Sequence, residues 1–158
     1  MSVRHVRPEP EAAGLRFCLL AAQWNEAYVA RLVDAALDVL QRRGAAEADL
    51  EVRWVPGSFE LPVAARWAAE SGRFDAVLAF GCVIRGETEH FRLVADASAH
   101  GLMRVALDTG VPVLNGVLAA YDADQAAARS GGEHGNTGAQ VALAAVHMAA
   151  LRRAAGAR

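Results

Sequence analysis

The stretch AVLAFGCVIRGETEHFRLV, residues 76–94, decides the fold class of this chain. It opens with an apolar run over residues 76–80, which can continue to Ile84, and such a run is typical of a strand buried on both faces. A polar turn over residues 85–89 follows, and the pattern beyond it predicts a helix from Phe91 to about residue 107. A strand that leads through a short loop into a helix is the unit from which α/β proteins with parallel sheets are built.

The same alternation recurs before and after this stretch. Apolar periodicities of both kinds predict further strands at residues 15–22, 50–55 and 111–118, and further helices at residues 27–43, 61–70, 122–130 and 138–155. We therefore predict a three-layer α/β sandwich with a mostly parallel, four-stranded sheet and helices on both faces. Such sheets bind ligands beyond the carboxyl ends of their strands, so the loops there decide the function.

Shorter signals mark the ends of these elements. Asp122 is expected to cap the helix that follows it, and Asn136 or Thr137 the last helix, after a glycine-rich loop over residues 131–135. Residues 1–14, which include two prolines, are expected to form an arm without a core of its own. Residues 15–158 are expected to form a single domain, a size that allows a real core.

Composition excludes several classes of function. The formal net charge is −2 and no apolar run reaches the length of a bilayer span, so neither nucleic acid nor a membrane is expected as a partner. The N-terminus lacks the apolar segment of a secretory signal, so we expect a cytoplasmic protein. Cys18 and Cys82 lie in separate apolar stretches and are predicted to be buried, reduced thiols. No Cys or His pair has the spacing of a zinc site, so no metal is expected.

The basic residues are all arginine, 16 in total, because the chain contains no lysine. This excludes a lysine Schiff base, and with it pyridoxal-phosphate chemistry and lysine-type aldolases. It also excludes a phosphate-binding P-loop, which requires a lysine. Any imine chemistry in this protein must use an amine that a substrate carries.

The densest polar cluster, residues 85–90, lies between the central strand and its helix. Gly86 lets a ligand approach the backbone closely, and we expect the amides of Glu87 and Thr88 to open the helix, where the helix dipole favours an anion. The alternative is that Thr88 merely caps the helix. His90 can both take and give a proton near neutral pH, although a lone histidine at a helix start is often only structural.

Two other predicted loops carry candidate binding residues. Ser58 and Glu60 follow the second strand and suit a ligand with several hydroxyl groups, although a helix cap with an acid in the first turn would give the same pattern. Trp24 and Asn25 follow the first strand, where a tryptophan can stack on a flat heterocycle. Packing of Trp24 in the core is the alternative.

Five segments, in this order and spacing, resemble the 6,7-dimethyl-8-ribityllumazine synthase family, over about residues 16–151. They are Trp24-Asn25-Glu26, residues 56–62 (PGSFELP), residues 81–91 (GCVIRGETEHF), residues 112–118 (PVLNGVL), and Gln125-Ala126 with Arg129. The resemblance implies a flavodoxin-like fold and a transferase. Its reaction would condense 5-amino-6-(D-ribitylamino)uracil with 3,4-dihydroxy-2-butanone 4-phosphate to give 6,7-dimethyl-8-ribityllumazine, phosphate and water. The amine of the pyrimidine forms the imine, in agreement with the missing lysine, and no metal or organic cofactor is needed.

The resemblance also implies a role for each matching residue. His90 matches the proton-transfer residue, and Arg129 matches a phosphate-binding arginine that the neighbouring subunit supplies. The implied contacts to the pyrimidine and the ribityl chain are Trp24, Asn25, Gly57, Ser58, Phe59, Glu60, Cys82, Val83 and Ile84, with Asn115 closing the pocket from a neighbour. The implied phosphate contacts are Gly86, Glu87, Thr88 and Arg129.

The family assembles as homopentamers with active sites shared between adjacent subunits, and some members form a 60-subunit icosahedral shell. The short loop at residues 131–135 permits a shell, whereas the proline-containing arm, which can pair with a neighbouring subunit, opposes one, so both assemblies stay open. Thr137 stands where the family often has lysine, which leaves Arg129 to carry more of the phosphate charge.

Two other functions are also compatible with the pattern. One is a riboflavin synthase of the same fold, which joins two lumazines. The other is a lumazine- or flavin-binding protein without activity. The complete turn from Gly86 to His90 favours lumazine formation over the first, because that reaction has no phosphate substrate, and His90 and Arg129 argue against the second.

Overall fold

The computed structural model describes residues 2–156, which fold into alternating strands and helices. The strands are β1 (Phe17–Ala22), β2 (Leu50–Val55), β3 (Ala76–Ile84), β4 (Val113–Ala120), β5 (Ser130–Gly132) and β6 (Gly135–Asn136). The α-helices are α1 (Glu26–Arg42), α2 (Leu61–Glu70), α3 (His90–Thr109), α4 (Ala123–Arg129) and α5 (Thr137–Ala154). Single 3₁₀ turns, η1 (Glu47–Asp49) and η2 (Ser58–Glu60), precede β2 and α2.

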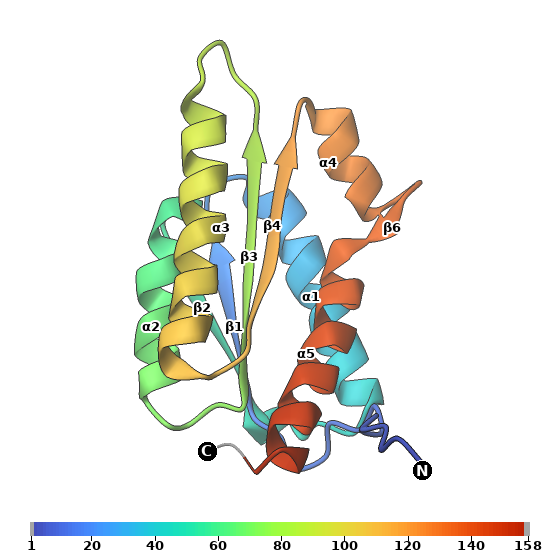
Figure 1. Ribbon diagram of the computed structural model, residues 1–158. Helices are drawn as coiled ribbons and strands as arrows, with labels where there is room; N and C mark the ends of the chain where they lie inside the picture. Colours follow the sequence, from blue (N-terminus) through green and yellow to red (C-terminus); the bar gives the residue numbers. More distant parts are fainter. Residues whose placement is uncertain (1, 157–158) are drawn as a thin grey trace.

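The main sheet has the order β2-β1-β3-β4, and all its pairings are parallel. Helices α2 and α3 cover one face and α1 and α5 the other, which gives the predicted three layers (Figure 1). β1 and β3 are the central strands, and all six residues of β1 are buried, as the uninterrupted apolar run predicted. The carboxyl ends of the strands therefore meet at one end of the sheet, below the β3–α3 loop and α4.

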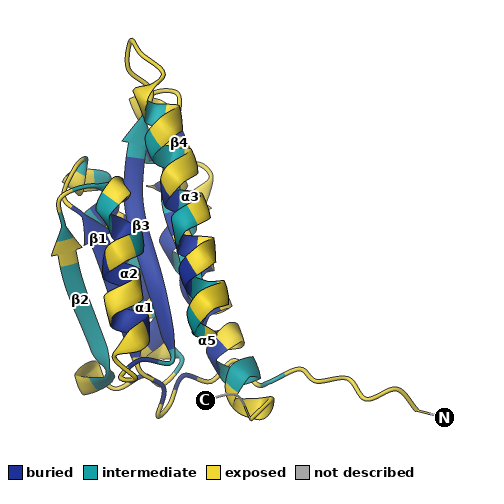
Figure 2. Ribbon diagram, turned by 60° about the vertical axis from the view of Figure 1, so that its left-hand side comes forward, coloured by how far each residue is buried: buried dark blue, intermediate teal, exposed yellow. Residues whose placement is uncertain are grey.

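Two apolar cores flank the sheet. Residues of β1 alternate between them: Phe17, Leu19 and Ala21 pack toward α1 and α5, whereas Cys18 and Leu20 pack toward α2. Many of the helical residues that face the sheet are alanine, so the helices lie close to it. The buried colouring in Figure 2 follows β1, β3 and the inner faces of the helices.

The structure corrects three details of the prediction. The loop at residues 131–135 is part of a two-stranded hairpin, β5–β6, rather than a plain loop. The fourth strand lies two residues later than predicted, at Val113–Ala120. The helix after β3 begins at His90, so the amides of Glu87 and Thr88 precede it instead of opening it. Of the expected caps, Asp122 accepts from the Gln125 N–H at 2.8 Å and Asn136 accepts from the Gly138 N–H at 2.8 Å.

The arm joins the domain only at its end. Residues 2–7 are exposed, and in Figure 2 this segment extends away from the body. Ala12 is fully buried in the core beside α1, and its N–H donates to the Arg43 carbonyl at 2.8 Å. No helix among residues 2–156 is long and apolar enough to cross a membrane.

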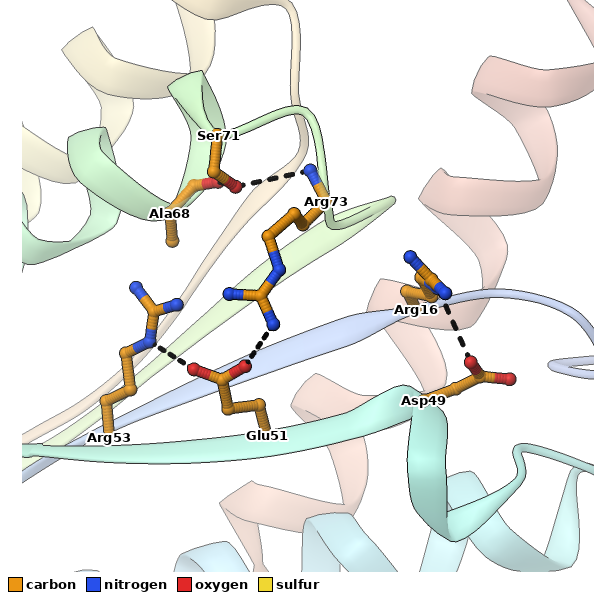
Figure 3. A network of polar contacts seen from close by, with 7 residues as sticks. All are labelled: Arg16, Asp49, Glu51, Arg53, Ala68, Ser71 and Arg73. Carbon is orange, nitrogen blue, oxygen red and sulfur yellow. Dashed lines mark hydrogen bonds and ion pairs between the residues drawn. The ribbon is translucent and has the colours of Figure 1, made fainter.

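An ionic network holds edge strand β2 on the side of the sheet away from the carboxyl ends of the strands (Figure 3). Glu51 on β2 accepts from Arg53 on the same strand and, at 2.8 Å, from Arg73 in the loop before β3. The hydrogen bond from Arg53 is the main cause that lowers the pKa of the Glu51 carboxyl below its ordinary value. Both guanidinium groups also lie over the Phe74 ring, so the network covers the apolar edge of the core.

Candidate active site

A pocket of about 790 Å³ opens at the carboxyl ends of β1, β2 and β3, beside the start of α3. Its wall contains twelve of the fifteen site residues predicted from the sequence. The other three, Glu87, Asn115 and Arg129, lie outside it. The lining residues are Trp24, Asn25, Pro56, Gly57, Ser58, Phe59, Glu60, Cys82, Val83, Ile84, Gly86, Thr88, His90, Phe91, Leu93 and Val94. The place agrees with the rule that open parallel sheets bind ligands at this edge.

The loop between β1 and α1 presents an exposed aromatic ring. Trp24 is 77% exposed, so the alternative of core packing is wrong. Its backbone is nevertheless held, because the Gln23 N–H donates to Val55 O at 2.8 Å and the Trp24 N–H donates to Pro56 O at 3.2 Å. A large apolar side chain on a fixed backbone, open to a cavity, is suited to stacking against a planar ligand.

Asn25 turns the chain from this loop into α1. It adopts the left-handed conformation, with φ 61° and ψ 40°, which asparagine tolerates better than most residues. Although it occupies the N-cap position of α1, its side chain makes no capping bond. The side-chain amide instead donates to the Cys82 carbonyl on β3 at 2.7 Å.

The loop between β2 and α2 adds the polar groups of a second wall. Ser58 is buried at 6% exposure beneath β3, where a Cβ on Gly81 would overlap its Oγ, so glycine at position 81 makes room for the hydroxyl. The Glu60 side chain folds back beside Gly57, with Oε2 3.3 Å from where a Cβ would stand. Neither Ser58 nor Glu60 caps α2 through its side chain, so the capping alternative is not supported.

The end of β3 supplies a peptide edge. The Val77 N–H donates to the carbonyl of Pro112, just before β4, and the Arg85 N–H donates to the carbonyl of Ala120, at the end of β4. In a parallel sheet, the N–H and C=O groups of one residue point to the same neighbouring strand, and this direction alternates from one residue to the next. Val83 is an even number of residues from Val77 and Arg85, so its peptide groups also face β4. The peptide groups of Cys82 and Ile84 face the opposite side, where Trp24 and Asn25 lie. Val83 thus faces the cavity only with its side chain.

The turn after β3 brings Gly86, Thr88 and His90 to the pocket. The Thr88 hydroxyl accepts from the His90 N–H at 3.3 Å, so this residue does tie down the first turn of α3. Nothing lies within 4 Å of a Cβ built on Gly86, which leaves this side of the backbone open. The carboxylate of Glu89 is 3.7 Å from Arg92, and Glu87 is exposed outside the pocket, so the two acids do not line the cavity.

An aromatic contact behind this turn was not foreseen. The rings of Phe91 and Tyr121 meet edge to face at 6.1 Å, and the Arg85 guanidinium lies 5.8 Å from the centre of the Tyr121 ring. Leu93 and Val94, one turn after His90, complete the apolar wall. The usable signal was the helical spacing from His90, which places residues three and four positions later on the same face.

Arg129 and Asn115 belong to other surfaces of the chain. Arg129 is exposed at the end of α4, and its guanidinium donates to Gln125 O at 3.3 Å. Asn115 is exposed on edge strand β4, where its side chain accepts from the Val117 N–H at 3.0 Å. A single chain therefore does not bring these two residues into its own pocket.

The thiols are unsuited to act as nucleophiles at neutral pH. Cys18 and Cys82 are both free and buried, as predicted. Burial raises the pKa of each to about 11. Cys82 thus contributes a small, neutral wall to the pocket.

Comparison with known proteins points in one direction. A family model described as 6,7-dimethyl-8-ribityllumazine synthase matches residues 14–153. A protein of that name from Stenotrophomonas maltophilia (strain R551-3) is 52% identical over 142 residues, which is 90% of each chain. Another from Xanthomonas oryzae pv. oryzae (strain PXO99A) is 49% identical over 136 residues, 86% of this chain and 88% of its own. The chloroplastic protein of that name from Arabidopsis thaliana is 44% identical over 151 residues, 95% of this chain and 66% of its own.

Proposed function

The chain belongs to the 6,7-dimethyl-8-ribityllumazine synthase family, and we propose that the pocket at the carboxyl ends of β1, β2 and β3 is its active site. The protein is a transferase that condenses 5-amino-6-(D-ribitylamino)uracil with 3,4-dihydroxy-2-butanone 4-phosphate. The amine of the pyrimidine forms an imine with the ketone and releases water, phosphate is eliminated, and the ring closes with loss of a second water to give 6,7-dimethyl-8-ribityllumazine.

One observation carries the assignment of the site. A single cavity combines an exposed indole, a buried serine beside a glutamate, an open peptide edge and a histidine at a helix start. Each of these four features suits a different part of the two substrates. The flat pyrimidine needs a stacking surface, its edge needs peptide donors and acceptors, the ribityl chain needs hydroxyl partners, and the ring closure needs proton transfer.

The pyrimidine half of the site lies between the β1 and β3 ends. Trp24 stacks on the ring, and the peptide groups of Ile84 bond to its edge, next to the Cys82 carbonyl that already accepts from Asn25. Ser58 and Glu60 bind hydroxyl groups of the ribityl chain, while Gly57 and Phe59 shape the wall beside them. Asn25 and Val83 complete this half of the pocket.

The butanone phosphate occupies the other half. Its phosphate lies against Gly86 and Thr88, and of Glu87, which is otherwise outside the pocket, only the backbone amide takes part. Arg129 of a neighbouring subunit balances the charge. His90 passes the protons that imine formation, elimination and ring closure require, a role worth roughly 10²- to 10⁴-fold in rate. Holding the two substrates together supplies much of the remaining acceleration.

A homopentamer completes the site. Arg129 and Asn115 are exposed and lie outside the pocket of their own chain, so adjacent subunits can supply them. Large apolar side chains on α2 and α3 also face solvent in the single chain, namely Val63, Trp67, Leu93, Met103 and Leu107. Such exposure is expected of an interface. Sedimentation distinguishes a pentamer from a 60-subunit shell.

The cytoplasm is the compartment that we propose, because both buried cysteines are free and suit a reducing environment.

The function itself is tested by mixing the purified protein with both substrates, without added metal or cofactor, and following lumazine absorbance and phosphate release. Clear acceleration over the uncatalysed reaction is expected. Tight pyrimidine binding without turnover would instead identify a binding protein.

A further inference from the structure

Asn25 combines three unusual properties. Among residues 2–156 it is the only non-glycine residue with positive φ. It sits at the N-cap of α1, a position where asparagine usually bonds to the helix, yet its side chain makes no such bond. The amide reaches a residue 57 positions away, the Cys82 carbonyl, at 2.7 Å. A sparsely populated backbone conformation persists when surrounding contacts determine it, and such positions cluster at functional sites.

The contact closes a gap in the backbone pairing of the sheet. β1 pairs with β3 only as far as Ala21 and Phe80. Beyond that point, the N–H groups of Gln23 and Trp24 both donate toward the β2 side, to Val55 and Pro56. The Asn25 side chain supplies the hydrogen bond on the β3 side. The loop that carries Trp24 is thereby fixed between two strands instead of one.

The same bond fixes the other partner. The Cys82 carbonyl lies on the side of β3 that faces the pocket. The peptide groups of Ile84, two residues later, point to the same side, because the direction of the peptide groups alternates along a strand. A donor that holds this carbonyl sets the orientation of the last peptide units of β3. Asn25 therefore joins the stacking surface and the peptide edge, the two elements that must be at a fixed distance and angle to hold one flat ring.

We propose that Asn25 is a positioning residue, whose amide locks the Trp24 loop to the end of β3 before any substrate arrives. One of its donors is committed to Cys82, so its principal task is to preorganise the site rather than to bind substrate. The proposal rests on the proposed function for its effect on catalysis, but the lock itself is a property of the ligand-free protein.

Two substitutions separate the side chain from the backbone. Asn25→Gly keeps the left-handed conformation and removes the amide, whereas Asn25→Asp keeps the shape and sets a carboxylate against the Cys82 carbonyl. Gln23→Glu is the matched control, since it adds the same charge to an exposed position of the same loop, outside the pocket. All variants are prepared as the assembled protein and checked for assembly by sedimentation.

The first measurement uses no substrate. With Trp54→Phe and Trp67→Phe as background, the remaining fluorescence comes from Trp24, and its anisotropy reports the mobility of the loop. We expect a lower anisotropy in both Asn25 variants, faster hydrogen exchange in a peptide covering residues 81–85, and no change in Gln23→Glu. Unchanged anisotropy and exchange in both variants would overturn the proposal, even if the KM for the pyrimidine rose, because Asn25 would then be a direct substrate contact.

The second measurement is kinetic. Loss of one hydrogen bond of this kind is expected to lower kcat/KM for the pyrimidine by about 5- to 10-fold in Asn25→Gly, and by more in Asn25→Asp, with Gln23→Glu as wild type. Normal kcat/KM in Asn25→Gly would overturn the positioning role. If the wild-type protein formed no lumazine, the proposed function would fail, while the ligand-free measurements would still decide whether the lock exists.

Discussion

His90 holds the first position of α3, and its backbone N–H is tied to the Thr88 hydroxyl while its side chain lines the pocket. A proton carrier at this place is useful but not indispensable, because positioning of the substrates contributes independently. We expect His90→Ala to lower kcat by roughly 10²- to 10⁴-fold and to leave measurable activity. Steady-state kinetics with both substrates saturating would check this, and unchanged turnover would remove His90 from the mechanism.

Cys82 provides a test of the pocket wall that needs no substrate. Burial raises the pKa of its thiol from the ordinary 9.0 to about 11. Only the thiolate reacts with iodoacetamide, so at pH 8 the reactive fraction should be about 100-fold below that of a free thiol. Reactivity should rise as the pH approaches 11. Labelling is followed by mass spectrometry in a Cys18→Ala background, with the denatured protein as the fast reference; rapid labelling of the folded protein near pH 7 would show that the thiol is not sequestered.

At this scale the sequence predicted the identities of the pocket residues better than their contacts. Trp24, Glu60 and His90 could be chosen because aromatic, acidic and imidazole groups follow strands at one edge of the sheet. The bond between Asn25 and Cys82 could not be foreseen, because the usual role of an asparagine at this position is to cap the helix. Which peptide groups of residues 82–84 face the cavity depends on the strand pairing, which no single segment specifies.

Among the elements, the packing of α5 on α1 depends on one glycine. A Cβ on Gly138 would lie 2.8 Å from the Leu32 Cα and closer still to its carbonyl group, so the two helix backbones approach at this point. Alanine favours helix over glycine by about 1 kcal/mol, yet the overlap should outweigh this gain. We expect Gly138→Ala to lower the free energy of unfolding by about 3 kcal/mol.

Chemical denaturation of the purified protein measures this change. The exposed neighbour Gln140 serves as the control, and Gln140→Ala should alter stability by less than about 0.5 kcal/mol. A Gly138→Ala protein as stable as the wild type would mean that α1 and α5 can separate without cost.

The network on edge strand β2 predicts a pH dependence. The Arg53 hydrogen bond lowers the pKa of Glu51 in the folded state, so the contribution of this carboxylate is present above its unfolded pKa and is lost as the pH falls through the folded value. Because Glu51 is about a third exposed, we expect Glu51→Gln to cost only about 0.5 kcal/mol at pH 7. Denaturation at a series of pH values should show the difference between wild type and variant shrinking below pH 4.5, and a difference that grew there would contradict the assignment.

The bounds of several strands and helices could be predicted from the spacing of apolar residues. The six apolar residues of β1 and the helical spacing in α1 and α2 gave bounds within two residues of those observed. The hairpin of β5 and β6 was missed because its residues are mostly glycine and polar, and they carry no alternation. The start of α3 was predicted within one residue of the observed position. The expectation that the amides of Glu87 and Thr88 open this helix was wrong, because the polar residues before His90 carry no periodicity that marks the first turn.

In the whole molecule, the pocket is apolar and aromatic on one side and polar at the α3 turn, but no arginine among residues 2–156 lies in its wall. The missing charge matters because one substrate is a phosphate ester, and a phosphate site without a cation would bind it weakly. Arg129 at the end of α4 is exposed and lies outside this pocket. Sequence alone could assign the arginine only through family resemblance, because Arg129 lies outside the pocket of its own chain.

Arg129→Ala alone is expected to raise the KM for the butanone phosphate, and a change confined to the pyrimidine KM would contradict the phosphate role.

Complementation tests whether sites are shared between subunits. His90→Ala and Arg129→Ala subunits are co-expressed in equal amounts with distinct affinity tags, and the mixed oligomers are isolated. If each site takes His90 from one subunit and Arg129 from its neighbour, random mixing makes about a quarter of the sites intact. The mixed protein should therefore recover about a quarter of the wild-type kcat/KM, far above either parent, whereas sites built within one chain would give only the average of the two parents.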